Sequence, residues 1–217
     1  MRSARLLRAG IVFASLALAL VAAGAALSLR VARAATVAPP ASAALAWDET
    51  LELRQSYNAC ASYSTMAFAY ATRGERLDPE AIKRSIRGKM ANGYVYPWGI
   101  TSYLRLRGLR PATWWLRFLS PRERADWVRS AVAGGRPVVL IVGNRKYLHY
   151  VTVLGYSGKV FDLYDSDFVG NGAAGNGAAG NGARPGNRAM GETALLDWWW
   201  GARFKGLRLD AAICAAP

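Results

Sequence analysis

Residues 136–165 read RPVVLIVGNRKYLHYVTVLGYSGKVFDLYD, and this stretch decides the fold class. Apolar side chains recur with the two-residue period of β-strands over 136–143, 147–156 and 159–165. The dipeptide Ser157-Gly158 separates the last two segments, and so short a connection is typical of a hairpin. The stretch therefore predicts three consecutive antiparallel strands.

Helical patterns dominate the chain upstream of these strands. A helix is predicted from Cys60 to Gly74, because Tyr63, Met66 and Tyr70 recur at spacings of three and four residues. Three more helices are expected over 78–90, where Asp-Pro-Glu is a helix start, over 99–108, and over 120–135, where Ser-Pro-Arg-Glu is a capping box.

The remaining elements are a strand at 111–118, a short helix at 192–200 and a closing strand at 204–213. Helices therefore gather in the N-terminal half and strands in the C-terminal half. Such segregation predicts an α+β fold with an antiparallel sheet rather than a doubly wound parallel sheet.

The composition allows one packed domain with a basic surface. The chain has 217 residues, of which 53% are hydrophobic, and its net charge is +14. Five of the arginines precede residue 35, which leaves +9 on the remainder. A basic surface can attract nucleic acid, but the sequence has no zinc-finger spacing, RNP motif or arginine-rich block. We therefore expect no nucleic-acid partner.

The first 34 residues have the pattern of an export segment. Three arginines precede an uncharged apolar run over 9–29, and Ala-Arg-Ala follows at 32–34. This order predicts either a cleaved signal peptide or an uncleaved membrane anchor. The domain is then expected outside the cytoplasm, either free in the periplasm or medium or held at the inner membrane. Residues 35–46, rich in Pro and Ala, read as a linker, so that the folded domain is expected over 47–217.

Residues 169–187 repeat the unit Gly-Asn-Gly-Ala-Ala. The repeat contains no Asp to bind calcium, and no Lys-Ser or Lys-Thr follows it as in a phosphate-binding loop. We interpret it as a flexible surface loop. We expect no cofactor and no bound metal.

The chain has a single histidine, His149, which lies in the strand predicted over 147–156. Asp165 ends the next strand of the hairpin, where its carboxylate could hold the imidazole in one tautomer. Asp162 and Asp167 are weaker candidates, because Asp162 has the opposite strand parity and Asp167 follows the strand end. A histidine in a strand can also be purely structural.

Cys60 opens the first predicted helix, and Gln55 lies five residues before it. A thiol at a helix start is favoured as a thiolate by the helix dipole and by unpaired N–H groups. A nearby imidazolium would complete a nucleophile. The amide of Gln55, with the backbone N–H of Cys60, could hold an oxyanion.

Each of these residues also has a plain structural explanation. Cys60 could be a small buried hydrophobe, or it could form a disulfide with Cys214, the only other cysteine, since exported proteins often contain disulfides. Gln55 could be a solvated loop residue.

Four segments carry a resemblance to a known family. They are QSYNACASYSTMAF (55–68), GITSYLRLRGLR (99–110), PVVLIVGNRKYLHYVTVLGY (137–156) and KVFDLYDS (159–166). Across about residues 50–168, the chain resembles papain-like cysteine peptidases, and most of all a stand-alone form of the bacteriocin-processing, double-glycine-leader peptidases. The resemblance implies a papain-like fold, with Cys60 as nucleophile, His149 as base, Asp165 orienting the histidine and Gln55 in the oxyanion hole.

Two positions depart from the family pattern. Ala61 follows the cysteine where the family usually has Gly, and Ser166 follows the aspartate where Pro is frequent. The implied function is an exported or membrane-anchored cysteine peptidase that acts on a peptide or protein substrate. Two alternatives are a non-catalytic peptide-binding module, to which Trp198, Trp199 and Trp200 could contribute, and a related acyl transferase or amidase.

Overall fold

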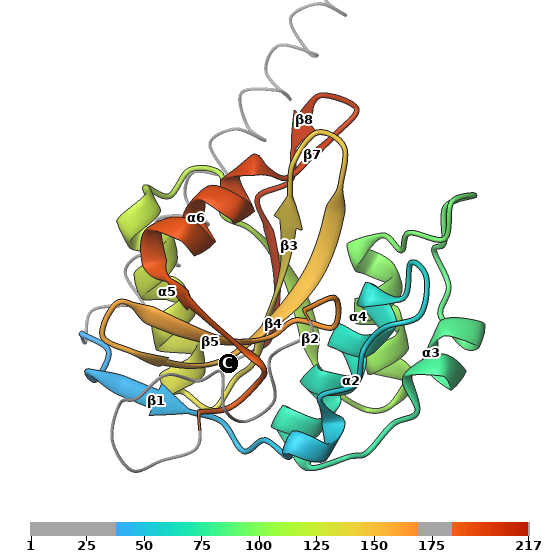
Figure 1. Ribbon diagram of the computed structural model, residues 1–217, viewed down its shortest axis with the longest axis horizontal. Coiled ribbons are helices and arrows are strands. Elements are labelled where there is room, and N and C mark those ends of the chain that lie inside the picture. The colour runs from blue at the N-terminus through green and yellow to red at the C-terminus, as the bar shows by residue number, and fades with distance from the viewer. Residues whose placement is uncertain (1–37, 169–183, 217) are drawn as a thin grey trace, which may run out of the picture.

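The computed structural model describes residues 38–168 and 184–216 (Figure 1). The predicted export segment and most of the glycine-rich repeat lie outside the described residues. The described helices are α2 (Cys60–Arg73), α3 (Pro79–Ser85), α4 (Pro97–Leu106), α5 (Pro121–Ala133) and α6 (Glu192–Gly201), with a short 3₁₀ helix η1 (Glu49–Leu51).

The strands are β1 (Ser42–Ala44), β2 (Pro111–Trp115), β3 (Val138–Gly143), β4 (Leu148–Ser157), β5 (Val160–Tyr164), β6 (Arg188–Gly191), β7 (Arg203–Phe204), β8 (Leu207–Arg208) and β9 (Ala211–Ala215). Seven of them form one antiparallel sheet in the order β2-β9-β3-β4-β5-β6, with β1 paired to β4. The predicted run of three antiparallel strands is confirmed as β3, β4 and β5.

Helices cover both faces of this sheet, and strand parity divides the core in two (Figure 1). Val139, Ile141, Tyr150 and Leu154 point into a cluster with helices α2, α3 and α4. Their neighbours along the same strands point into a second cluster with α5 and α6, and these include Val138, Leu140, Val142, Val151 and Val153. Because helices cover both faces of the sheet, the central strands carry apolar side chains on both faces rather than on one.

Local signals set the ends of the helices as predicted. Helix α2 ends at Gly74, which has a φ of 69° in the left-handed region that favours glycine. Helix α5 begins with a complete capping box, in which Ser120 and Glu123 each bond the other's backbone. Helix α3 is shorter than predicted, because Ile86 is extended and Gly88 has a φ of 74°.

Two predicted segments differ in the structure. The single closing strand expected over 204–213 is instead the hairpin β7–β8 followed by β9, because Lys205 and Gly206 both have positive φ and turn the chain. The segment expected to be a linker over 35–46 contains β1, which pairs with the end of β4. The ordered fold therefore begins before Trp47.

An ion pair between α5 and the segment before β9 is buried inside the fold. Arg124 of α5 is 2% exposed, and its guanidinium lies 3.6 Å from the carboxylate of Asp210, which is 3% exposed. The same guanidinium donates to the carbonyls of Leu116 and Leu119, each at 3.1 Å, and lies over the ring of Trp200. These contacts attach α5 to the segment before β9.

A search of residues 38–168 and 184–216 finds no helix whose length and apolar character would allow it to span a membrane.

Candidate active site

The N-terminus of α2 places Cys60 beside the open end of the β4–β5 hairpin. The helix starts at Cys60, and its N-cap residue, Ala59, has no side chain that could accept from the first N–H groups. Among the described residues, the N–H of Cys60 donates no hydrogen bond. An unpaired N–H at a helix start is suited to bind an oxyanion.

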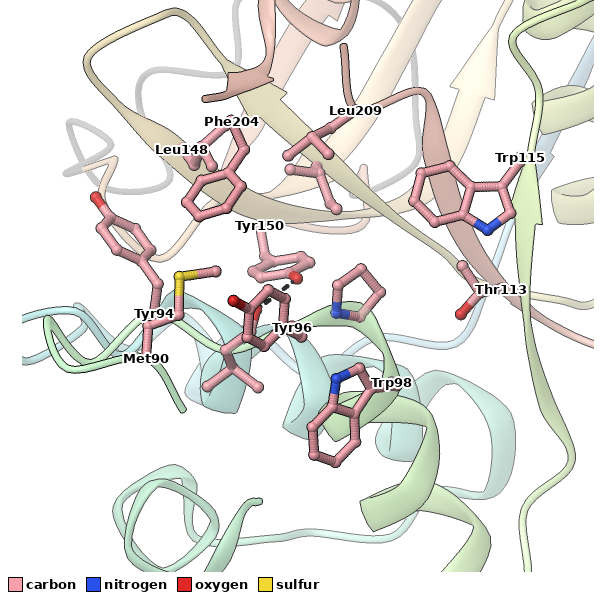
Figure 2. Close-up of a pocket in the computed structure, with 13 residues that line it drawn as sticks. Met90, Tyr94, Tyr96, Trp98, Thr113, Trp115, Leu148, Tyr150, Phe204 and Leu209 are labelled. Carbon is pink, nitrogen blue, oxygen red and sulfur yellow. Dashed lines mark hydrogen bonds between the residues drawn. The ribbon is translucent and has the colours of Figure 1, made fainter. Parts of the chain in front are cut away.

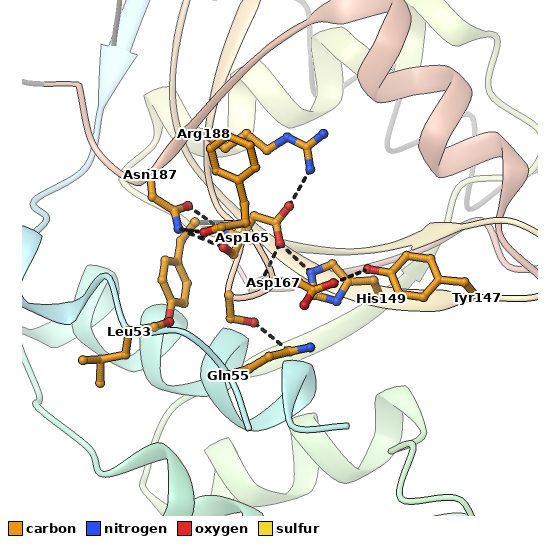
Figure 3. Close-up of polar contacts among 11 residues, drawn as sticks. Leu53, Gln55, Tyr147, His149, Asp165, Asp167, Asn187 and Arg188 are labelled. Atoms are coloured by element: carbon orange, nitrogen blue, oxygen red, sulfur yellow. Dashed lines mark hydrogen bonds and ion pairs between the residues drawn. The ribbon is translucent and has the colours of Figure 1, made fainter. Parts of the chain in front are cut away.

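His149 and Asp165 are in direct contact (Figure 3). His149 belongs to β4 and Asp165 follows β5, and His149 Nε2 lies 2.7 Å from Asp165 Oδ1. Both side chains are almost fully buried, with 1% and 2% of their surface exposed. Because Nε2 is engaged by the carboxylate, Nδ1 is the ring atom left to face another group.

The thiol of Cys60 acts on the same imidazole. Burial opposes the charged ring and lowers the pKa of His149, but hydrogen bonding and charge from Asp165 and Cys60 outweigh burial and raise it to about 9. His149 Nδ1 has no hydrogen bond of ordinary geometry among the described residues. The influence of Cys60 on the pKa of His149 is what links the thiol to this imidazole.

Gln55 is attached to the strand end that carries Asp165. Its Oε1 accepts from the hydroxyl of Ser166 at 2.9 Å, and its backbone N–H donates to the Ser166 carbonyl at 2.8 Å. Since Oε1 is occupied, the amide NH₂ is left as a donor on the other side. Ser166 therefore orients this amide.

The structure places His149 and Asp165 in contact and attaches Gln55 to the residue after Asp165, whereas Cys60 is linked to them through its effect on the pKa of His149. Among the described residues, neither alternative carboxylate bonds His149. Asp162 pairs with Arg184 at 3.4 Å, and Asp167 approaches the hydroxyl of Tyr147 at 3.5 Å while its backbone N–H donates to Asp165.

Several residues around His149 and Asp165 were not predicted from the sequence to lie at this site. The rings of Tyr147 and Trp198 lie on His149 at centroid distances of 5.6 and 6.1 Å. Arg188 bonds Asp165 at 2.6 Å, and Asn187 bonds its backbone (Figure 3). Asn187 is the last residue of the glycine-rich segment and Arg188 follows it, and the sequence of that segment gives no register for the strand after it.

The two cysteines lie on opposite faces of the sheet. Cys60 belongs to the cluster under α2, whereas Cys214 of β9 belongs to the cluster under α5 and α6. Both are free thiols, so the disulfide that was considered is absent. Burial raises the pKa of Cys214 to about 11.

An apolar cavity of about 380 Å³ lies beside β4, the strand that carries His149 (Figure 2). Its walls come from the segment before α4, from β2, β4 and the β7–β8 hairpin, and they include Tyr94, Trp98, Trp115, Leu148, Tyr150 and Phe204. Leu148 directly precedes His149, and the charge of Cys60 acts on both Tyr94 and Tyr150. Two of the lining residues, Leu148 and Tyr150, therefore flank His149 along β4.

The three consecutive tryptophans do not form one exposed patch. Trp199 is buried in the core, Trp198 lies on His149, and Trp200 covers Arg124 and Arg208.

Among the described residues, no group of three or more His, Cys, Asp or Glu side chains could hold a metal ion.

Solved structures are the known proteins to which this chain is similar. No model of a protein family matches the chain, and no curated protein matches its sequence. A Bacillus anthracis protein described as a C39-like peptidase aligns at a TM-score of 0.52 and 12% identity, covering 81% of this chain and 98% of that one. The peptidase domain of Streptococcus ComA, a bi-functional ABC transporter involved in a quorum-sensing pathway, aligns at a TM-score of 0.47 and 12% identity, covering 76% of this chain and 97% of that one.

At this level of identity, the likeness establishes the fold alone. The predicted α+β fold is therefore confirmed, and it is the fold of a C39-like peptidase structure.

Proposed function

We propose that this chain, which has the fold of a C39-like peptidase, is a cysteine peptidase that hydrolyses peptide bonds through Cys60, His149, Asp165 and Gln55. The observation that carries the proposal is the buried contact of 2.7 Å between His149 and Asp165, on an imidazole whose pKa the Cys60 thiol also raises. A buried structural histidine would not require a cysteine at a helix start beside it.

The chemistry follows from these positions. The Cys60 thiolate attacks the peptide carbonyl carbon, and the resulting oxyanion accepts hydrogen bonds from the Gln55 amide and the Cys60 N–H. The imidazolium of His149 donates its proton to the departing amine, and a thioester with Cys60 remains. Water then attacks the thioester while His149 removes its proton, which releases the acid and restores the thiolate. Asp165 keeps the ring oriented throughout.

The apolar cavity gives this peptidase a preference for its substrate. None of its lining residues carries a formal charge, so a buried lysine or glutamate of the substrate would lose its hydration without compensation. Large aliphatic or aromatic side chains would gain from the same burial. We therefore propose peptide substrates with a large apolar side chain near the cleaved bond.

The proposed place of action is outside the cytoplasm. The support is the arginine-flanked apolar run at the N-terminus, which acts as a signal peptide or an anchor. Contact with a membrane would come through this segment.

The test is a thiol-reactive peptide analogue followed by intact mass and peptide mapping. A probe with a phenylalanine side chain is expected to modify Cys60 once, and a matched probe with lysine at that position should react much more slowly. Cys214 is an internal control, because its buried thiol has a pKa of about 11 and should stay unmodified. Equal modification of both cysteines, or of neither, would refute the proposal.

The pH dependence of hydrolysis follows from the raised pKa of His149. The imidazolium that protonates the leaving amine is present below a pKa of about 9, compared with an ordinary value of 6.5. Activity should therefore persist through neutral pH and fall as pH rises through about 9.

The raised pKa of His149 also makes the folding stability depend on pH. The stability contributed by the charged ring is complete below about pH 6.5 and is lost as pH rises through about 9. The pKa of His149 can be measured from the pH profile of the rate and from an NMR titration of the chain's single imidazole. An inflection near 6.5 in both would contradict a raised pKa for this residue.

A further inference from the structure

The carboxylate of Asp165 is held on both of its oxygens. Oδ1 lies 2.7 Å from His149 Nε2 and accepts from the N–H of Asp167 at 3.1 Å. Oδ2 lies 2.6 Å from an Nη1 of Arg188. Only one of these oxygens is used in the proposed mechanism, and the contact to Arg188 is left unexplained by it.

Arg188 is fixed independently of the histidine. Its guanidinium lies over the ring of Trp198 at 4.7 Å and over the ring of Phe168 at 5.1 Å. The preceding residue, Asn187, accepts from the Asp165 N–H and donates to the Asp165 carbonyl, each at 2.8 Å. Residues at the start of β6 thus bond both the backbone and the carboxylate of Asp165 (Figure 3).

A fixed second oxygen matters because a carboxylate can rotate. If Oδ2 were free, the group could turn or tilt and move Oδ1 out of line with His149 Nε2. The planar guanidinium, with directed N–H groups and two aromatic rings against it, prevents this rotation more firmly than a flexible ammonium could. The ring of Trp198 also stacks on the imidazole at a centroid distance of 6.1 Å, so Arg188 and His149 both pack against Trp198.

We propose that Arg188 is a positioning residue, which acts through Asp165 to keep the imidazole of His149 in line for proton transfer. The inference rests on the proposed peptidase function, and it adds a member to the site that lies on β6, beyond the glycine-rich repeat. Arg188 would contact neither the substrate nor the reacting atoms.

Electrostatics support this geometry. Burial raises the pKa of Asp165, but hydrogen bonds and charge from His149, together with the hydrogen bond from Arg188, bring it below its ordinary value. The titratable groups around this carboxylate are His149 and Arg188 in contact, with Tyr147 and Tyr164 close enough to feel its charge. Loss of Arg188 removes one of the groups that keep Asp165 ionised.

The experiment compares Arg188→Gln and Arg188→Lys with Arg184→Gln. The control removes the same charge four residues away, from the ion pair with Asp162. With the apolar peptide substrate, Arg188→Gln is expected to lower kcat about 10- to 100-fold with little change in KM, since a misplaced catalytic group costs about that much. Arg188→Lys should recover part of kcat, and Arg184→Gln should match the unmodified chain.

A second measurement does not need activity. His149 gives the only imidazole signals of the chain, and protonation of the adjacent Asp165 appears in them as a separate acidic inflection. In Arg188→Gln this inflection should move to higher pH, because Asp165 loses a hydrogen bond that lowers its pKa. A merely structural role of Arg188 would lower the amount of folded protein without moving the inflection.

The possible outcomes separate the two claims. If the unmodified chain neither hydrolyses peptide nor reacts at Cys60, the peptidase function fails, and the NMR titration still decides whether Arg188 holds Asp165. If the unmodified chain is active and Arg188→Gln behaves like Arg184→Gln in kcat and in the titration, the inference about Arg188 is overturned.

Discussion

Replacing His149 with alanine will abolish thiol labelling of Cys60 at neutral pH and lower peptide hydrolysis by about 10²- to 10⁴-fold, the range expected for loss of a general acid–base. The physical reason is that in the proposed mechanism His149 both stabilises the Cys60 thiolate and protonates the leaving amine. Its bond of 2.7 Å to the buried Asp165 orients the ring for this role. Rates with the apolar peptide probe and its mass adduct measure the effect.

The matched control is Asp167→Asn. This change removes a carboxylate two residues from Asp165 and leaves the backbone N–H that Asp165 accepts from. Activity should be close to that of the unmodified chain. Circular dichroism verifies that His149→Ala is folded. If labelling of Cys60 is unchanged in the folded variant, the cysteine reacts without the imidazole, and the proposed Cys–His pair is wrong.

Replacing Arg124 with methionine will cost about 3 to 5 kcal/mol of unfolding free energy, the usual range for breaking a buried ion pair. Methionine keeps the apolar length of the side chain but leaves Asp210, 3% exposed, without its counter-charge. The carbonyls of Leu116 and Leu119 lose their donor as well. Urea unfolding followed by tryptophan fluorescence measures the loss.

Two further variants sharpen this prediction. Arg122→Met, whose side chain is 90% exposed and faces Asp126 at 3.8 Å, should change stability very little. The double variant Arg124→Met with Asp210→Asn should recover part of the loss, since no uncompensated carboxylate is then buried. A loss below about 1 kcal/mol in Arg124→Met would mean that the pair does not hold α5 in place.

The sequence was most informative where the local signal and the tertiary environment agree. The strand period over 136–165 predicted β3, β4 and β5, and the sequence signals at Asp78, Gly74 and Ser120 predicted helix ends. The hairpin between β4 and β5 also made Asp165 the preferred partner of His149, and the two are in contact. The catalytic roles of these residues stay predictions until the thiol is tested.

The remaining features depend on contacts that a single sequence does not encode locally. Arg188 reaches Asp165 only because β6 pairs with β5, and no pattern around residue 188 reports that register. Trp198 could not be separated from Trp199 by composition, although one lies on the histidine and the other in the core. The turn at Lys205 and Gly206 was hidden within an apolar run that looked like one strand.

The separation of the two cysteines by the full thickness of the sheet decides how Cys60 responds to oxidants. If its thiol is oxidised to a sulfenic acid, no second thiol of the chain can reach it to form an internal disulfide, because Cys214 faces the other core. Recovery must then come from a small thiol or a reductase outside the protein, and in their absence further oxidation of Cys60 is irreversible.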